Sequence, residues 1–341
     1  MMTLHLNPNE FKDLITIASQ NSGISSDIIE KDYYVTLMLQ ELSIKQKTID
    51  AYFKGGTCLY KIYAPMQRFS EDIDITVQST GLSTSKTKHN LRSVSKEYSS
   101  LSMDTDNLSN ENRKGSITQV FNYHSCFNVP DDPLQRYEKV KIEATSFTVS
   151  EPYETNMIHS LLLDALPDNI KDDVKLIYGL EDFSINNITL ERIFCDKLLA
   201  AEFYAERDEK FDVAKHIYDI VNMMQMPRIQ NMLCDKEAFI ENMSYKRLEE
   251  TKRIGSDLSG KPLSNLCLYN YIKLDAFKAE YEKMQGKYVF DKKYQIPYAN
   301  IVNYSCKLEK RMKELSEHEL DFLQSEEFHE RIIQYNPELK Q

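Results

Sequence analysis

Two short segments of the chain combine residue types that suit phosphate and metal chemistry. The first is Gly55-Gly56-Thr57, and the second carries Asp72 and Asp74. Two glycines between a strand and a helix let the backbone turn tightly and approach a ligand. A helix that opens at this point presents free N–H groups and the positive end of its dipole, which suits a phosphate. Thr57 adds a hydroxyl at the same place, so the first segment is predicted to bind nucleotide phosphates.

The two aspartates predict a metal site. Asp72 and Asp74 are two residues apart, so on a strand both carboxylates face the same side. Two adjacent carboxylates repel each other, and a shared cation explains them best. Mg²⁺ is the usual candidate, because carboxylates and substrate phosphates bind it together. A third carboxylate is expected on a neighbouring strand to complete a two-metal site, and Glu143 is the best-placed candidate by pattern.

Each of these features has an ordinary structural explanation when it stands alone. A Gly-Gly pair is usually a turn, an Asp-x-Asp pair is usually a solvated strand face, and a strand acid such as Glu143 often faces water. The order strand, Gly-Gly, helix, Asp-x-Asp strand favours a functional site over these explanations.

The elements that position this site are predicted as a small mixed sheet flanked by helices. Alternating or β-rich runs predict strands at 51–54, 73–77, 116–129 and 138–149, and a helix is expected at 57–63. Thin periodicity predicts a weak helix between Leu91 and Leu101, with exposed loops on both sides.

Helices are predicted at both ends of the chain. Asn7-Pro8 begins the first helix, Gly23 ends it, and a second helix begins near Ser25 or Ser26. From Thr189 onward the pattern is helical. The fold class is therefore α+β, with a mostly helical C-terminal half. Four segments are expected: an N-terminal helical segment (1–50), the catalytic core (51–150), a helical part of the site (151–227) and a helical C-terminal region (228–341).

Composition excludes several classes of protein. The 341 residues carry 42 Lys and Arg against 53 Asp and Glu, a formal net charge of −11, so the chain is not expected to coat nucleic acid by charge alone. No apolar stretch approaches the roughly 20 residues that span a bilayer, and the N-terminus does not resemble a secretion signal. The six cysteines are scattered without metal-ligand spacing. We therefore expect a cytoplasmic protein with no membrane partner.

The motifs resemble those of a known family. Gly55-Gly56-Thr57, together with the segment from Arg68 through Ser70 and Glu71 to Asp74, looks like the first motif of the AbiEii/AbiGii-type abortive-infection toxins. These are nucleotidyltransferase-fold proteins of the DNA polymerase β superfamily. The similarity covers roughly residues 25–225. Three further segments carry it: Glu30-Lys31-Asp32-Tyr33-Tyr34, the helix around Lys197, and Lys215-His216-Ile217-Tyr218-Asp219-Ile220.

The resemblance implies roles for particular residues. Lys197 would contact the nucleotide phosphates, and Asp219 would support the catalytic centre or the lysine. Thr57 stands where the family commonly has Ser, which keeps the hydroxyl. His216 stands where the closing motif usually has its first Asp, which leaves Asp219 to carry any acidic role.

Other charged residues have weaker patterns. Asp212, His216 and Asp219 share one helical face, which fits either a metal site or, more commonly, a solvated face. Lys31 and Asp32 are expected to form an ion pair that braces the second helix. The acidic balance further predicts a confined basic patch, for which Lys54, Arg68 and Lys197 are the first candidates, and Arg68 is also a candidate nucleotide ligand.

The function predicted from these features is a Mg²⁺-dependent nucleotidyltransferase that uses a nucleoside triphosphate. The resemblance adds that it would be the toxin of a type IV toxin–antitoxin pair, with RNA, notably a tRNA 3′ end, as acceptor and a cognate antitoxin encoded nearby. Three alternatives stay open: a small-molecule (antibiotic-type) nucleotidyltransferase, a non-catalytic nucleotide-binding interaction protein, and a structural interaction protein with a vestigial site.

Overall fold

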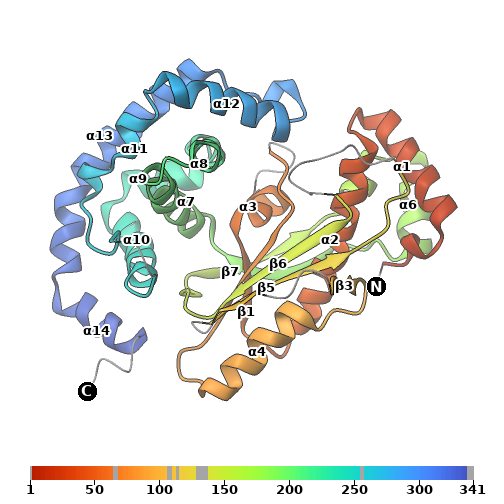
Figure 1. Ribbon diagram of the computed structural model, residues 1–341, viewed down its shortest axis with the longest axis horizontal. Coiled ribbons are helices and arrows are strands. Elements are labelled where there is room, and N and C mark those ends of the chain that lie inside the picture. The colour runs from red at the N-terminus through yellow and green to blue at the C-terminus, as the bar shows by residue number, and fades with distance from the viewer. Residues whose placement is uncertain are drawn as a thin grey trace. The chain divides into compact units, whose positions relative to one another are not determined.

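The chain divides into two compact units. The structure is a computed structural model that describes residues 2–63, 68–105, 110–112, 115–127, 137–253 and 257–335. The first unit comprises Met1–Tyr63 and Ser70–Asn187, and the second comprises Ala64–Phe69 and Ile188–Gln341. Figure 1 shows the sheet of the first unit and the helices of the second.

In its described residues, the first unit contains eight strands and the helices of the N-terminal half. Its strands are β1 (Ala51–Lys54), β2 (Ile73–Val77), β3 (Ser102–Met103), β4 (Asn110–Asn112), β5 (Ser116–Asn122), β6 (Lys139–Thr145), β7 (Tyr153–Ile158) and β8 (Phe183–Ile188). Its helices are η1 (Leu4–Leu6), α1 (Pro8–Ser22), α2 (Ser26–Lys45), α3 (Gly55–Cys58), η2 (Leu59–Tyr63), α4 (Thr84–Lys96), α5 (Leu161–Ala165) and α6 (Asp168–Tyr178).

One mixed sheet joins these strands. The order is β3-β5-β6-β2-β1-β8-β7, and β4 also pairs with β5. β2 lies antiparallel to β1 and parallel to β6, while β6 lies antiparallel to β5. The parallel register aligns Asp74 with Glu143, so strands far apart in the sequence bring these two acids to adjacent positions.

The two faces of the central strands differ in polarity. Residues of β5 and β6 alternate between buried and half-buried positions, as expected for strands with one covered face. Ile73, Ile142 and Phe121 belong to the covered face, where they are at most 1% exposed. Helix α4 packs against β5 and β6. Ser83 is the N-cap residue of α4, and its side chain accepts a hydrogen bond from the Lys86 N–H. The opposite face carries the acidic residues.

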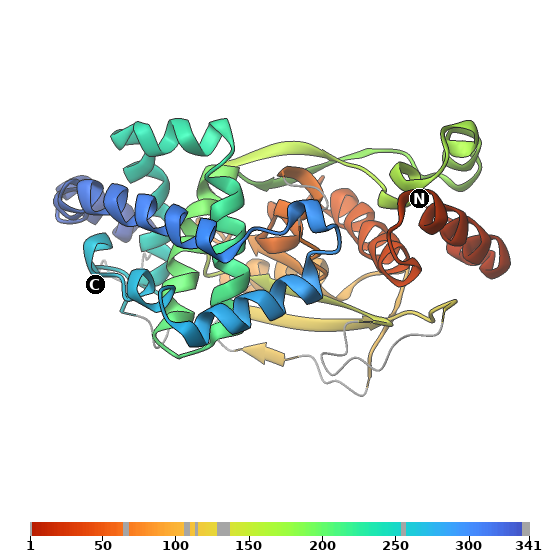
Figure 2. The ribbon, with the colours of Figure 1, turned by 90° about the horizontal axis from the view of Figure 1, so that it is seen from above.

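The second unit is helical in the described residues. It contains α7 (Leu190–Ala205), α8 (Lys210–Met223), α9 (Pro227–Cys234), α10 (Lys236–Glu250), η3 (Leu263–Asn265), α11 (Leu268–Tyr271), α12 (Asp275–Tyr288), η4 (Lys292–Tyr294), α13 (Tyr298–Leu323) and α14 (Glu326–Tyr335). Figure 2 shows these helices, coloured green to blue, from above. Buried ion pairs tie them together: the guanidinium of Arg247, which is fully buried, contacts Glu319 at 2.7 Å.

The predicted α+β class and the main strands are confirmed, and three expectations are corrected. The segment 151–227 is not all helical, because it contains β7 and β8, and residues up to 187 belong to the first unit. α4 begins at Thr84, well before the expected start at Leu91. The short strands β3 and β4 lie in a region predicted as loop. Among the described residues, no helix is long and apolar enough to cross a membrane.

Candidate active site

The Gly-Gly turn between β1 and α3 lies directly against an acidic side chain. Gly55 has a φ of +80°, a conformation that L side chains rarely adopt. A Cβ at this position would lie 2.0 Å from Oδ2 and 2.8 Å from Cγ of Asp74. Only glycine therefore allows the Asp74 carboxylate to lie against the backbone here. The sequence predicted a close approach of backbone and phosphate at this turn, and the structure places a carboxylate beside it.

Thr57 fixes the segment that leads into β2. Its side chain is fully buried, and Oγ1 donates to the backbone carbonyl oxygen of Asp72 and lies 3.1 Å from Ser70 Oγ. The hydroxyl is therefore directed at the protein backbone. The structure gives Thr57 a positioning contact, in contrast to the expected contact with a phosphate.

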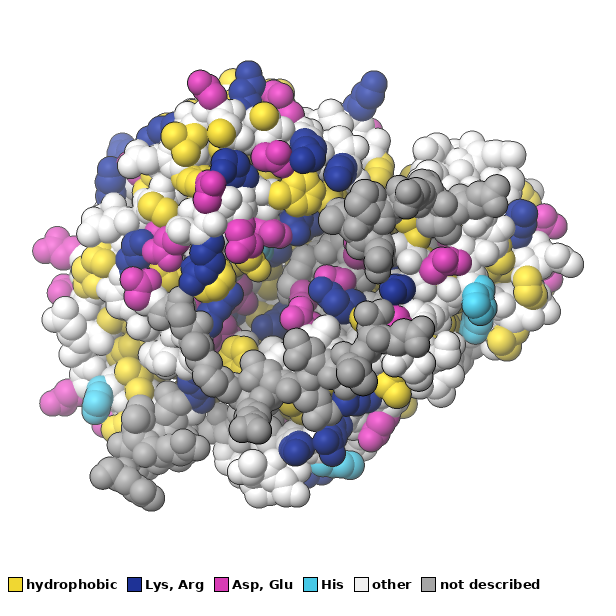
Figure 3. Space-filling model, in the orientation of Figure 1, with side chains coloured by type: hydrophobic (Ala, Val, Ile, Leu, Met, Phe, Trp, Pro, Cys, Tyr) yellow, Lys and Arg dark blue, Asp and Glu magenta, His cyan; other side chains and the backbone are white. Residues whose placement is uncertain are grey.

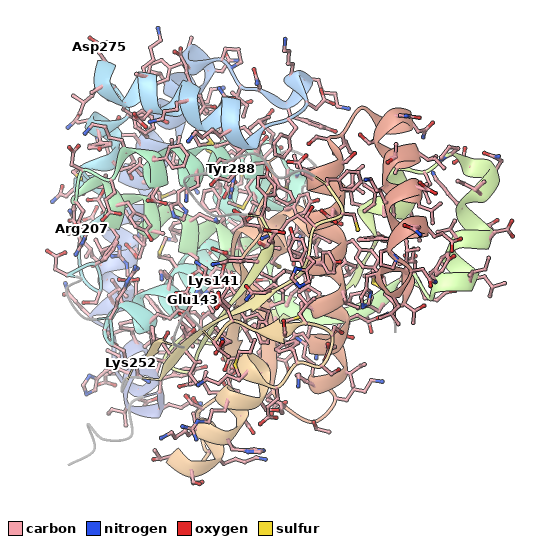
Figure 4. The ribbon with its side chains drawn as sticks, turned by 45° about the vertical axis from the view of Figure 1, so that its right-hand side comes forward. Lys141, Glu143, Arg207, Lys252, Asp275 and Tyr288 are labelled. Carbon is pink, nitrogen blue, oxygen red and sulfur yellow. The ribbon has the colours of Figure 1, made fainter. Side chains whose placement is uncertain are left out.

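The acidic residues and one lysine share the half-buried face of β2 and β6. Asp74 is the register partner of Glu143, and Asp72 precedes β2 by one residue. Lys141, two residues before Glu143, places Nζ 2.7 Å from Asp72 Oδ2 and 4.0 Å from Glu143 Oε2. Figure 4 labels Lys141 and Glu143 next to each other on this strand. The structure thus places the three predicted acids on one strand face, and it adds Lys141, which the sequence patterns did not single out.

The charges on this face perturb one another. Burial, followed by the neighbouring negative charges of Glu143 and Asp72, raises the pKa of Asp74 to about 7. Burial would lower the pKa of Lys141, but the carboxylate of Asp72 outweighs it and the pKa is raised. Lys141 therefore stays protonated at neutral pH and offsets part of the negative charge of the neighbouring carboxylates.

The side chains on this face offer the type of ligand atom that a hard divalent cation prefers. Asp72, Asp74 and Glu143 supply only carboxylate oxygens, the ligands that Mg²⁺ prefers, and a cationic Nζ already lies against two of them. As the side chains stand, no three His, Cys, Asp or Glu side chains in the described ranges converge closely enough to hold a metal ion.

A second charged cluster lies in the helical unit. Arg68 Nε and Nη2 donate to the two carboxylate oxygens of Asp219 on α8, at 2.9 and 2.8 Å. Lys197 Nζ on α7 lies 2.8 Å from Asp219 Oδ2. Burial alone would raise the pKa of Asp219, but Arg68 and Lys197 hold it well below its usual range. Asp219 thus contacts Lys197, one of the two supporting roles that the resemblance implied, and Arg68 shares the same carboxylate.

The cluster also corrects the expected basic patch. Arg68 is 8% and Lys197 7% exposed, so neither forms part of an open basic surface. On the face drawn in Figure 3, Lys and Arg side chains are interspersed with Asp and Glu. Two cations on one carboxylate nevertheless leave this buried cluster with one net positive charge.

The other members of the predicted helical face have separate partners. Asp212 pairs with Lys215 at 2.6 Å. The ring of His216 stacks on Tyr204 with centroids 5.4 Å apart, and burial followed by the charge of Lys197 lowers its pKa well below the usual value. Asp212, His216 and Asp219 thus form neither a metal site nor a uniformly solvated face in this part of the structure.

The first turns of α2 hold several segments of the first unit. Glu30 accepts hydrogen bonds from Ser125 Oγ and the Cys126 N–H, and so holds the chain that follows β5. Lys31 lies 3.5 Å from Glu71 and donates to the Lys139 carbonyl oxygen at the start of β6.

Asp32 holds the helix that follows the Gly-Gly turn. It accepts from Lys61 Nζ at 2.8 Å and from Tyr60 Oη at 2.8 Å, and both donors lie on η2. Lys31 and Asp32 therefore do not pair with each other as expected. Adjacent residues on a helix point in directions about 100° apart, so their adjacency in the sequence already argued against an ion pair between them.

Comparison with known proteins identifies a family. The family model described as nucleotidyl transferase AbiEii toxin, type IV toxin–antitoxin system, matches residues 37–298. This range contains both charged clusters. No curated protein matches the chain's sequence.

Proposed function

Because the chain belongs to the AbiEii family of nucleotidyl transferase toxins of type IV toxin–antitoxin systems, we propose that it transfers a nucleotidyl group from a nucleoside triphosphate to an acceptor hydroxyl in a Mg²⁺-dependent reaction. The observation that carries this proposal is the alignment of Asp74 with Glu143 across β2 and β6, beside a glycine that no other residue can replace without displacing Asp74.

Each residue of the acidic face has a distinct task in the proposed reaction. Asp72, Asp74 and Glu143 would hold Mg²⁺, which would neutralise phosphate charge and orient the triphosphate. Gly55 leaves room for the Asp74 carboxylate, and the backbone of the Gly55–Gly56 turn would contact the outgoing phosphates. Thr57 holds the segment that carries Asp72 through its contact with the Asp72 carbonyl oxygen.

The proposed chemical step is an in-line displacement. The acceptor hydroxyl oxygen forms a bond to the α-phosphorus while the bond from that phosphorus to the bridging oxygen breaks, and pyrophosphate leaves with the bonding electrons. Glu143 accepts the proton of the attacking hydroxyl. It is 43% exposed at its side chain, so an acceptor from solution can reach it.

The second unit contains a preorganised cationic cluster of its own. Asp219 fixes Arg68 and Lys197 and leaves one net positive charge, which suits a triphosphate. We propose that Lys197 is the phosphate contact and Arg68 a second nucleotide ligand, and that Asp219 acts through these two residues.

The family implies a cognate antitoxin as partner. We propose that the acceptor is RNA, with a tRNA 3′ end as the first candidate.

The test is incubation of the protein with each labelled nucleoside triphosphate, Mg²⁺ and total RNA, followed by gel electrophoresis. The expected result is label on a tRNA-sized band with the wild-type protein and loss of that band with Asp72→Asn. A Lys139→Met variant is the matched control, since Lys139 lies on the same strand and pairs with Asp104. Label on a small molecule or on no acceptor with any nucleotide would contradict the proposal.

A further inference from the structure

Lys141 occupies the space between two of the three acids of the candidate site. Its Nζ lies 2.7 Å from Asp72 Oδ2, a charge-assisted contact, and 4.0 Å from Glu143 Oε2. The β2–β6 register explains the placement: Ile73 is aligned with Ile142, so the residues that precede them, Asp72 and Lys141, lie side by side.

This lysine and a divalent cation require the same oxygen atoms. An oxygen lone pair directed at an ammonium group 2.7 Å away is not available to a metal ion in the same direction. The ammonium of a lysine is a compact charge on a flexible stem, so it can leave such a contact without a change in the backbone. The side chain of Lys141 is 38% exposed, and those of Asp72 and Glu143 are 43% exposed, so each can rearrange into solvent.

We propose that Lys141 is a tethered counter-cation, which holds Asp72 and Glu143 in the metal-free protein and is displaced when a divalent cation binds. This inference rests on the proposed function, because it requires that the same carboxylates bind the metal.

Two opposite effects follow from this competition. In the metal-free protein, Lys141 reduces the repulsion among three acids on one face and so stabilises the first unit. During metal binding, the same contact must be broken, which lowers the affinity for the metal. A neutral side chain at this position should therefore lower the stability of the metal-free protein and raise its affinity for the metal. If Lys141 had a purely structural role, its replacement would change only the stability.

The experiment is calorimetric titration of the full chain with Mn²⁺ alone, as a probe of the divalent site, together with thermal unfolding with and without Mn²⁺. Lys141→Met keeps the length of the side chain and removes its charge. We expect Lys141→Met to bind Mn²⁺ about two- to fivefold more tightly than wild type, the range that a partly exposed ion pair supports. We also expect a lower melting temperature without metal and a larger increase when Mn²⁺ is added.

Two further variants make the result specific. Lys139→Met removes a lysine from the same face that pairs with Asp104 at 3.4 Å, so it should bind Mn²⁺ as wild type does. Lys141→Arg returns a cation to the position and should restore weaker binding. A variant Lys141→Met that folds only when Mn²⁺ is present also supports the inference.

The outcomes separate this inference from the proposed function. If wild type binds Mn²⁺ and Lys141→Met binds it equally or more weakly, the counter-cation role is refuted while the metal site stands. If neither protein binds Mn²⁺, the metal-dependent function and the inference both fail.

Discussion

Gly55→Ala is the most informative single perturbation of the candidate site. Gly55 adopts a φ of +80°, and the added Cβ would lie 2.0 Å from Oδ2, 2.8 Å from Cγ and 3.0 Å from Cβ of Asp74. The left-handed conformation costs an alanine about 1 kcal/mol. The added Cβ would also displace the half-buried side chain of Asp74, which it would meet at three atoms, and this steric overlap adds about 1–3 kcal/mol. The expected loss in the free energy of unfolding is therefore about 2–4 kcal/mol.

Gly23→Ala is the matched control for this prediction. Gly23 lies in the same unit with a φ of +74° at the end of α1, and a Cβ there meets no atom within 4 Å. It should therefore cost only the backbone strain, about 1 kcal/mol. The difference between the two variants isolates the collision with Asp74.

The assay is urea unfolding followed by circular dichroism, paired with calorimetric Mn²⁺ binding. Gly55→Ala should lose both stability and metal affinity, whereas Gly23→Ala should lose a little stability and no affinity. Equal losses of stability in the two variants, with Mn²⁺ affinity unchanged in Gly55→Ala, would refute the reasoning, because Asp74 would then not depend on a glycine beside it.

Three further predictions concern buried charge. The native pKa of Asp74, about 7, lies above the value near 3.8 of the unfolded chain, so the native state binds more protons between these two pH values. The free energy of unfolding should therefore fall by a few kcal/mol as the pH rises from about 4 to about 7. Asp74→Asn should remove this dependence on pH, as measured by urea titrations at several pH values. Asp219→Asn leaves two buried cations without their carboxylate and should destabilise the second unit by about 3–5 kcal/mol; unfolding that is unchanged would contradict the buried cluster. Lys61→Met leaves the buried carboxylate of Asp32 without its cation and should cost a similar amount, measured by thermal unfolding, unless the ion pair does not form.

Local sequence patterns predicted the part of the site that lies close together in the chain. The Gly-Gly turn, the alternation of β2 and the alternation of β6 placed Asp72, Asp74 and Glu143 on half-buried strand faces, because each signal lies within a few residues.

Features that depend on long-range pairing were not predictable in this way. Lys141 meets Asp72 only through the parallel register of β2 and β6, which are separated by more than 60 residues. Lys197 meets Asp219 through the packing of α7 and α8, and Arg68 reaches the same carboxylate from 151 residues away in the chain, so their burial has no local signal.

β7 and β8 were missed for a related reason. β7 is mostly exposed or half-buried along its length, and β8 carries asparagines where a central strand usually carries apolar residues. Both sequences therefore lack the hydrophobic alternation that predicts a strand. Asn187 of β8 is fully buried and donates to Tyr63 Oη at 2.6 Å, a tertiary contact that satisfies its polar side chain.

Transfer of a nucleotidyl group, which carries the α-phosphorus of the triphosphate, is tested most directly by following which phosphorus of the nucleotide reaches the acceptor. The same reaction is run with nucleoside triphosphate labelled at the α-phosphorus and, in parallel, at the γ-phosphorus. The acceptor is expected to gain only the α label, and pyrophosphate is expected to carry the γ label, with both signals lost in Asp74→Asn. Transfer of the γ label to the acceptor, or transfer that persists in Asp74→Asn, would contradict it.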